Sequence, residues 1–128
     1  MAGILTYKNA AHATIYKNFL LNSPYKYGGR FLGALFLLTV NRDVWPRAKR
    51  AIVGKEIYFE RINLRGLTSF GYALVIMAQD IYDNTSHVNL FDLSDTYLLS
   101  EKAIKIILSA ITVAREGYDA IGISKEFT

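Results

Sequence analysis

Apolar side chains recur at three- and four-residue intervals along most of the chain, which is the spacing of an amphipathic α-helix. This pattern predicts a first helix from Asn9 to Asn22. Pro24 ends it, because the residue before a proline is disfavoured in the helical conformation. A second helix, from about Arg30 to Val40, is apolar almost all round, so we expect it at the centre of the protein.

The next segment predicts a third helix and then an ambiguous stretch. Asp43 is a suitable N-cap, Pro46 falls in the first turn, and Gly54 ends the helix after Ile52 or Val53. Residues 56–62 fit either a short strand or a short helix. Because no convincing strand partner stands out in the sequence, we expect a short helix or an extended connector there.

The second half predicts two long helical regions. Residues 67–83 show the clearest helical periodicity, and Thr68 or Ser69 can cap their start. The last region begins at Asp92 or Ser94, with a break near Ser100, and Gly117 is a natural C-cap. A loose tail is expected from about residue 121. The side chains expected to face the core from the last helix are Ile104, Ile107, Leu108 and Ile111.

Composition supports one compact all-α domain over residues 1–128, a bundle of five or six helices with at most a short extended segment near 56–62. Of the 128 residues, 52% are hydrophobic and 20% charged, enough apolar surface for a core. The absence of cysteine excludes disulfides and thiolate chemistry. The longest uncharged run, 14 residues from Gly66 to Gln79, is too short to cross a bilayer. No signal peptide pattern is present, so we expect a cytoplasmic protein.

Charge divides the chain into a basic and an acidic half. Residues 1–65 carry eleven Lys/Arg against three Asp/Glu, a formal net charge of +8. Residues 66–128 carry four against eight, a net charge of −4. Such a dipole favours an anionic partner or head-to-tail association into a homo-oligomer. The alternative is that the two halves neutralise each other within one fold.

Basic residues concentrate between Arg42 and Arg65, with Trp45 among them, directly before a predicted helix start. Free N–H groups at a helix N-terminus favour anions, arginine side chains bind phosphate through paired hydrogen bonds, and aromatic rings can stack on a base. The candidate anion-binding residues are Arg42, Arg47, Arg50, Arg61, Arg65, Thr68 and Ser69. The arginines could instead form a solvated face that pairs with Glu56, Glu60 and the acidic half.

Residues suited to catalysis are scarce. The chain has two histidines, and His87 stands next to Ser86, where adjacent side chains rarely form a nucleophile–base pair. No phosphate loop or dinucleotide fingerprint occurs. One acidic cluster has the ligand types of a divalent-cation site, although such residues also cap helix ends: Asp80, Asp83, His87, Asp92 and Asp95. We expect neither enzyme activity, nor a bound metal, nor a cofactor.

Three motifs carry a family resemblance. They are His12 with Tyr16 in the opening helix, the apolar run 34–38 followed by Arg42-Asp43 and Arg47, and the turn Arg65-Gly66-Leu67-Thr68-Ser69 before a long apolar helix. Together they resemble a small uncharacterised all-helical family, a domain of unknown function, of Gram-positive bacteria and their phages and mobile elements. The resemblance implies a compact helical accessory protein and implies no activity.

These observations predict a small non-enzymatic binding protein that captures an anionic ligand, either a nucleotide or the phosphates of a nucleic acid. By analogy with other small mobile-element proteins, we expect an antagonist of host defence. The alternative is a protein–protein interaction module, either an inhibitor of a host protein or a self-assembling subunit. Its basis is the count of nine tyrosines and seven phenylalanines, more than one small core buries fully.

Overall fold

The computed structural model describes residues 4–88, 94 and 100–123. Over these residues the chain is a bundle of six α-helices with one short antiparallel hairpin and a 3-10 turn. The predicted all-α bundle with a short extended segment is therefore confirmed. None of the helices in this part of the chain is long and apolar enough to cross a membrane.

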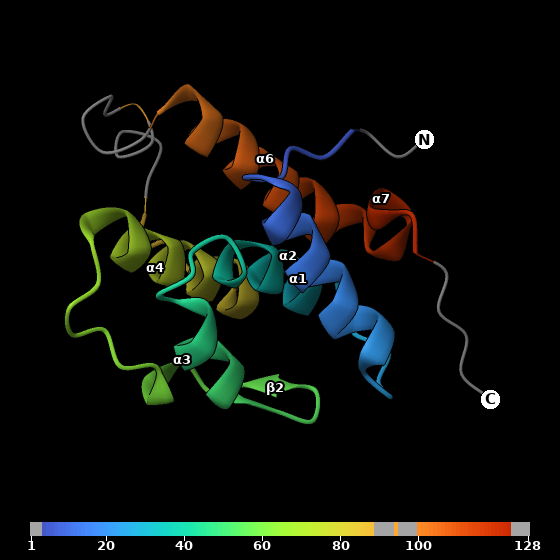
Figure 1. The fold of residues 1–128 in the computed structure, drawn as a ribbon, viewed down its shortest axis with the longest axis horizontal. Helices are drawn as coiled ribbons and strands as arrows, with labels where there is room; N and C mark the ends of the chain where they lie inside the picture. The colour runs from blue at the N-terminus through green and yellow to red at the C-terminus, as the bar shows by residue number, and fades with distance from the viewer. Residues whose placement is uncertain (1–3, 89–93, 95–99, 124–128) are drawn as a thin grey trace.

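Figure 1 shows how the elements are arranged around α2. In chain order they are α1 (Ala10–Asn22), α2 (Gly29–Leu38), α3 (Trp45–Arg50), β1 (Ile52–Val53), β2 (Glu56–Ile57), η1 (Phe59–Arg61), α4 (Ser69–Asp83), α6 (Glu101–Glu116) and α7 (Tyr118–Ile121). Every residue of α2 from Phe31 to Leu38 is buried, as its uniformly apolar sequence predicts. Helices α4 and α6 pack against it (Figure 1).

Local capping explains why the predicted helix ends agree with the structure. The Asn9 side chain accepts a hydrogen bond from the His12 N–H at 2.8 Å and begins α1. Thr68 caps α4 and Ser100 caps α6 in the same way. Each hydroxyl accepts a hydrogen bond from the backbone N–H three residues later. Gly117 ends α6 with a φ of 69°. The expected start at Asp92 lies outside the described residues.

The third helix is shorter than predicted, because its expected last turn is a strand. Ile52 pairs with Ile57 and Val53 with Glu56 across a two-residue loop, where Gly54 has a φ of 61°. The expectation that residues 56–62 lack a strand partner is therefore wrong. Each strand has only two residues, too few to show alternation in the sequence. The remainder of the ambiguous stretch forms η1.

Asp43 does not cap the third helix. The Asn41 side chain accepts hydrogen bonds from the backbone N–H groups of Asp43 and Val44, at 2.7 and 3.2 Å, and so shapes the turn that leads into α3. Pro46 does fall in the first turn, as predicted.

Helix α6 buries only part of the predicted face, because Ile107 is buried and Ile104 packs against the core as expected, whereas Leu108 and Ile111 do not. Leu108 is 55% and Ile111 40% exposed, whereas Ser109 is buried. The Ser109 hydroxyl accepts a hydrogen bond from the Thr6 N–H at 2.8 Å and donates to the Lys105 carbonyl at 2.9 Å. Its polar group is therefore satisfied inside the protein. This contact joins residues 103 positions apart, which helical periodicity does not reveal.

Helix α7 was not expected from the sequence. It extends the ordered chain beyond Gly117, and Ile121, where a loose tail was expected to begin, is buried at 7% exposure. Residues 124–128 of that tail lie outside the described part of the chain.

Candidate functional site

The predicted anion-binding residues have different structural roles. Arg47 holds the loop before α4, because its Nη1 donates to the backbone carbonyls of Asn63 and Arg65 at 2.6 and 2.7 Å. Arg61 lies over the Tyr58 ring, 4.2 Å from its centroid. Arg42 and Arg50 are exposed, and over the described residues neither belongs to an ion pair.

At the start of α4, one of the groups predicted to bind an anion is hydrogen-bonded within the protein. The Thr68 hydroxyl accepts a hydrogen bond from the Gly71 N–H at 3.0 Å, so it serves as the helix cap. Arg47, Arg65 and the Gly66 turn are brought together beside this helix start, where Gly66 has a φ of 78°. Ser69 is exposed at the first position of α4. Hydrogen bonds within the protein therefore hold the start of α4 and the loop before it in place.

The basic half of the chain is not neutralised by ion pairs. Over the described residues, one Lys/Arg–carboxylate pair occurs, Lys105 with Glu101 at 3.8 Å on α6. None of the eleven basic side chains of residues 1–65 belongs to it. Glu56, a partner expected in the alternative interpretation, instead accepts a hydrogen bond from the Tyr82 hydroxyl. The positive charge is therefore available to an external anion.

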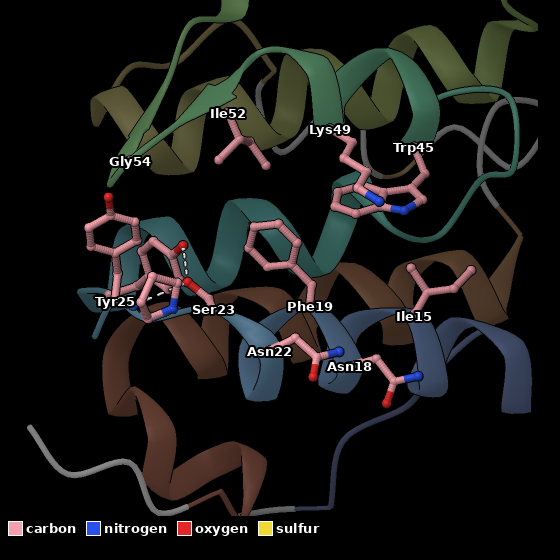
Figure 2. Close-up of a pocket in the computed structure, with 12 residues that line it drawn as sticks. Ile15, Asn18, Phe19, Asn22, Ser23, Tyr25, Trp45, Lys49, Ile52 and Gly54 are labelled. Carbon is pink, nitrogen blue, oxygen red and sulfur yellow. Dashed lines mark hydrogen bonds between the residues drawn. The ribbon is translucent and has the colours of Figure 1, made fainter.

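A cleft of about 580 Å³ opens between α1 on one side and α3 with the hairpin on the other (Figure 2). This is within the range of roughly 300–1,000 Å³ typical of small-molecule sites. Its lining combines α1 residues, the loop between α1 and α2, and both sides of the α3–β1 junction: Ile15, Asn18, Phe19, Asn22, Ser23, Pro24, Tyr25, Tyr27, Trp45, Lys49, Ile52 and Gly54. We call this hollow the aromatic cleft.

Aromatic rings form much of the interior of the aromatic cleft. Phe19 meets the Trp45 indole edge-to-face, with 5.6 Å between ring centroids, and lies 6.1 Å from Tyr27 in a stacked arrangement. Figure 2 shows Phe19 pointing from α1 toward the α3 side, where Trp45 and Lys49 project toward it. Tyr25 is 40% exposed at the end of the cleft next to Gly54 (Figure 2). A planar apolar group therefore has ring faces and edges to contact.

Polar groups stand on both walls of the aromatic cleft. Lys49 projects from α3, one turn after Trp45, and belongs to no ion pair among the described residues. Asn18 and Asn22 lie one turn apart on α1, on the opposite side (Figure 2). Within the described part of the chain, no hydrogen bond occupies either carboxamide. The cleft thus offers one cation and two amides, each a donor and an acceptor.

Hydrogen bonds hold the loop between α1 and α2 in one conformation. The hydroxyls of Ser23 and Tyr27 are 2.6 Å apart, and the Tyr25 N–H donates to the Ser23 oxygen at 3.2 Å. The Tyr27 N–H donates to the Tyr118 hydroxyl of α7 at 3.0 Å, and the Tyr27 ring stacks on Phe31 at 3.9 Å. Burial raises the pKa of Tyr27. The wall that Tyr25 and Tyr27 form is therefore built before any ligand arrives.

Neither histidine lies in the cleft. The His12 Nδ1 accepts a hydrogen bond from the Lys8 N–H at 2.9 Å, so its proton lies on Nε2, which donates to the Phe36 carbonyl at 2.9 Å. His87 is exposed, and its Nδ1 lies 2.7 Å from Asp80. The His12 side chain thus joins two backbone segments, whereas the His87 side chain contacts the Asp80 carboxylate.

Asp80 organises the turn after α4. Its carboxylate accepts hydrogen bonds from the Thr85 hydroxyl and the Val88 N–H in addition to the His87 contact. Burial alone would raise the pKa of Asp80, but these hydrogen bonds outweigh it and lower the pKa to about 2. Among the residues that the structure describes, no three His, Cys, Asp or Glu side chains gather as metal ligands would. Asp92 and Asp95 of the acidic cluster fall outside that set.

Sequence reasoning identified the basic region and Trp45 but missed the cleft. None of the seven predicted site residues lines it. The four-residue spacing of Trp45 and Lys49 on one helix face, and the same spacing of Asn18 and Asn22, could have indicated these two walls. That the two walls face each other follows only from the packing of α1 against α3.

No protein-family model, curated protein or solved structure matches this chain. The resemblance to a family of mobile elements therefore stays a prediction, and the geometry of the cleft is the basis for a functional proposal.

Proposed function

We propose that this protein is a non-enzymatic binding protein that captures an anionic ligand of the nucleotide class in the aromatic cleft. The observation that supports this is the combination of aromatic rings, one lysine and two carboxamides around one hollow, with no ion pair or hydrogen bond to these polar groups among the described residues. A nucleotide has the matching parts: a flat aromatic base, base edges with donors and acceptors, and a phosphate.

The energetics favour a ligand with both an aromatic and an anionic part. Contact of a base with aromatic side chains contributes about 1–3 kcal/mol per base. Since Lys49 has no ion-pair partner among the described residues, its charge can pair with a phosphate without loss of such a contact. A purely apolar ligand would gain nothing from the lysine and the two amides, which are exposed to water in the free protein.

The arginines have a supporting role in this proposal. Arg42, Arg50 and Arg65 are exposed, and together with the lysines they give the region around α3 a positive potential that raises the local concentration of anions. Arg47 acts mainly on the protein itself, since it binds the backbone of residues 63 and 65. The resemblance to mobile-element proteins suggests a setting in the host cytoplasm, where capture of a signalling nucleotide would antagonise host defence.

Trp45 provides a direct test, because it is the single tryptophan of the chain and lines the cleft. A nucleoside monophosphate should change its fluorescence in a saturable way. Lys49→Gln should weaken this binding by about tenfold, the effect of one charge-assisted contact. The matched control is Lys102→Gln, which removes an exposed lysine from α6 and should leave the affinity unchanged.

Native mass spectrometry of protein purified at low salt gives an independent measurement. A bound mass of a few hundred daltons that is lost on addition of salt would support the proposal, because phosphate contacts weaken as salt rises. A Trp45 signal that no nucleotide changes, at concentrations up to about a millimolar, would refute it.

The protein-interaction alternative has its support on α6 rather than in a tyrosine-rich face. Two of the described tyrosines, Tyr25 and Tyr72, are exposed, so a tyrosine-rich face is small. Leu108 and Ile111 form an exposed apolar pair on α6. Binding through these residues should depend little on salt, in contrast to nucleotide capture.

A further inference from the structure

A second hollow adjoins the aromatic cleft at Tyr25. It measures about 540 Å³, and its lining is Pro24, Tyr25, Lys26, Tyr27, Gly28 and Lys55. Three of these residues, Pro24, Tyr25 and Tyr27, also line the aromatic cleft. The two hollows therefore share one wall, and a ligand longer than a base can extend from one into the other across Tyr25. We call this second hollow the lysine hollow.

The lysine hollow differs from the aromatic cleft in its chemistry. Lys26 comes from the loop between α1 and α2, and Lys55 from the turn of the hairpin, so two distant segments place ammonium groups around one space. Both lysines are exposed and neither forms an ion pair among the described residues. Among the residues that the structure describes, no acidic side chain lines either hollow. An anion in this hollow could pair with both ammonium groups.

The backbone adds to this positive potential. Gly28 lines the lysine hollow and is the N-cap residue of α2, a helix whose start has neither a side-chain cap nor an acidic residue in its first turn. The positive end of the helix dipole thus has no cap or acidic side chain from α2 itself. This contribution adds to the charge of the two lysines, which is the main source of positive potential in the hollow.

Both lysines are attached to well-defined backbone. Lys55 is the second residue of a two-residue hairpin loop, and the positive φ of Gly54 allows that tight turn. Lys26 lies between Tyr25 and Tyr27, whose backbone N–H groups are hydrogen-bonded to Ser23 and Tyr118. Because this backbone is already ordered in the free protein, ligand binding loses less conformational entropy.

We infer that the lysine hollow is a phosphate subsite and that the captured ligand is a nucleoside polyphosphate. This inference rests on the proposed function. The base occupies the aromatic cleft, the phosphate nearest the sugar lies toward Lys49, and the phosphate chain passes Tyr25 to reach Lys26 and Lys55. A monophosphate satisfies Lys49 alone and leaves the two remaining lysines without a partner.

The test compares adenosine, adenosine monophosphate and adenosine triphosphate, with Trp45 fluorescence as the readout. The wild-type chain should bind the triphosphate at least about tenfold more tightly than the monophosphate, the effect expected of further charge-assisted contacts. In the double variant Lys26→Gln/Lys55→Gln, the affinity for the triphosphate should fall to that for the monophosphate. The affinity for the monophosphate should not change.

A matched double variant controls for net charge. Lys8→Gln/Lys102→Gln removes the same charge from exposed positions outside both hollows, and it should keep the tenfold preference for the triphosphate. Equal wild-type affinities for monophosphate and triphosphate would overturn the phosphate subsite and leave nucleotide capture in place. Absence of any nucleotide effect on Trp45 would overturn both. Inorganic tripolyphosphate binding as tightly as the triphosphate, or a single-stranded oligonucleotide binding more tightly, would also overturn the assignment of a nucleoside polyphosphate.

Discussion

His12 shows how one polar residue stabilises the bundle through its uncharged form. Its side chain is buried at 2% exposure, between the Tyr7 and Phe36 rings, and both ring nitrogens are hydrogen-bonded to backbone. A proton added to Nδ1 would break the hydrogen bond from the Lys8 N–H and place a charge in an apolar site. Burial therefore lowers the pKa of His12 to about 4, although the hydrogen bond to Phe36 opposes this shift.

The lowered pKa of His12 makes folding sensitive to mild acid. Between its ordinary pKa of about 6.5 and the folded pKa of about 4, the unfolded chain binds a proton that the folded chain does not. The free energy of unfolding should therefore fall as the pH drops through this window, by about 3 kcal/mol from this residue. Below pH 4 both states are protonated, and His12 adds no further loss.

Urea unfolding at several pH values tests this prediction. His12→Gln removes the titrating group, so its stability, lower at pH 7, should depend less on pH between 6.5 and 4 than that of the wild type. His87→Gln is the control, because that side chain is 61% exposed and its loss should leave the acid-induced destabilisation in place. Identical pH dependence of the wild type and His12→Gln would show that another group is responsible.

At the scale of elements, the contact between α2 and α6 depends on small residues. Gly29 and Gly33 lie one turn apart on α2 and face Ala114 and Ala110 of α6. A Cβ atom on Gly33 would lie 2.8 Å from the Ala110 carbonyl oxygen and 2.8 Å from the Ala114 Cβ. The backbones thus approach so closely that no side chain fits between them. This close approach also determines which face of α6 is buried.

Gly33→Ala should therefore destabilise the protein, although alanine is the better helix former. Helix propensity favours alanine by about 1 kcal/mol. Overpacking in a rigid contact costs about 1–3 kcal/mol, and here the added methyl group would meet backbone, which cannot move aside as a flexible side chain can. We expect a net loss of up to about 2 kcal/mol in urea unfolding.

Gly28→Ala is the matched control for the Gly33 substitution. Gly28 has a φ of −75°, and an added Cβ would meet nothing within 4 Å. This change should alter stability by less than about 1 kcal/mol, the difference between glycine and alanine as an N-cap. If Gly33→Ala instead increased stability, propensity would outweigh packing at this contact.

At the scale of the whole molecule, the separation of charge has an energetic consequence. The basic half carries a net charge of +8, and its Lys and Arg side chains form no ion pairs among the described residues. Their mutual repulsion opposes folding without being offset by local attraction. The same unpaired charge attracts an anionic ligand, so binding and stability are linked through it.

Salt should therefore stabilise the ligand-free protein. Raising sodium chloride to about 0.5 M shortens the screening length to a few ångströms and should increase the free energy of unfolding by up to about 1 kcal/mol. The double variant Arg42→Gln/Arg50→Gln, which removes two exposed charges from this half, should be less sensitive to salt. Destabilisation by salt would mean that attractive pairs dominate.

The sequence by itself determined the helical class, the central position of α2 and most helix ends. These features depend on interactions within about four residues, such as the caps of Asn9, Thr68 and Ser100, or on a segment with almost no polar face. Helix caps and uniformly apolar segments can both be recognised from a few neighbouring residues in the sequence. The basic character of the region from Arg42 to Arg65 is likewise a property of composition alone.

Only the tertiary structure decided where a ligand can bind and which face of α6 is buried. The aromatic cleft joins α1, the following loop, α3 and the hairpin, segments up to about forty residues apart, and its walls face each other because α1 packs beside α3. The hairpin that carries Lys55 has two residues per strand and becomes visible only when they pair. Ser109 is buried because Thr6, at the other end of the chain, meets it there. Such contacts depend on how distant elements pack, which periodicity along the chain does not specify.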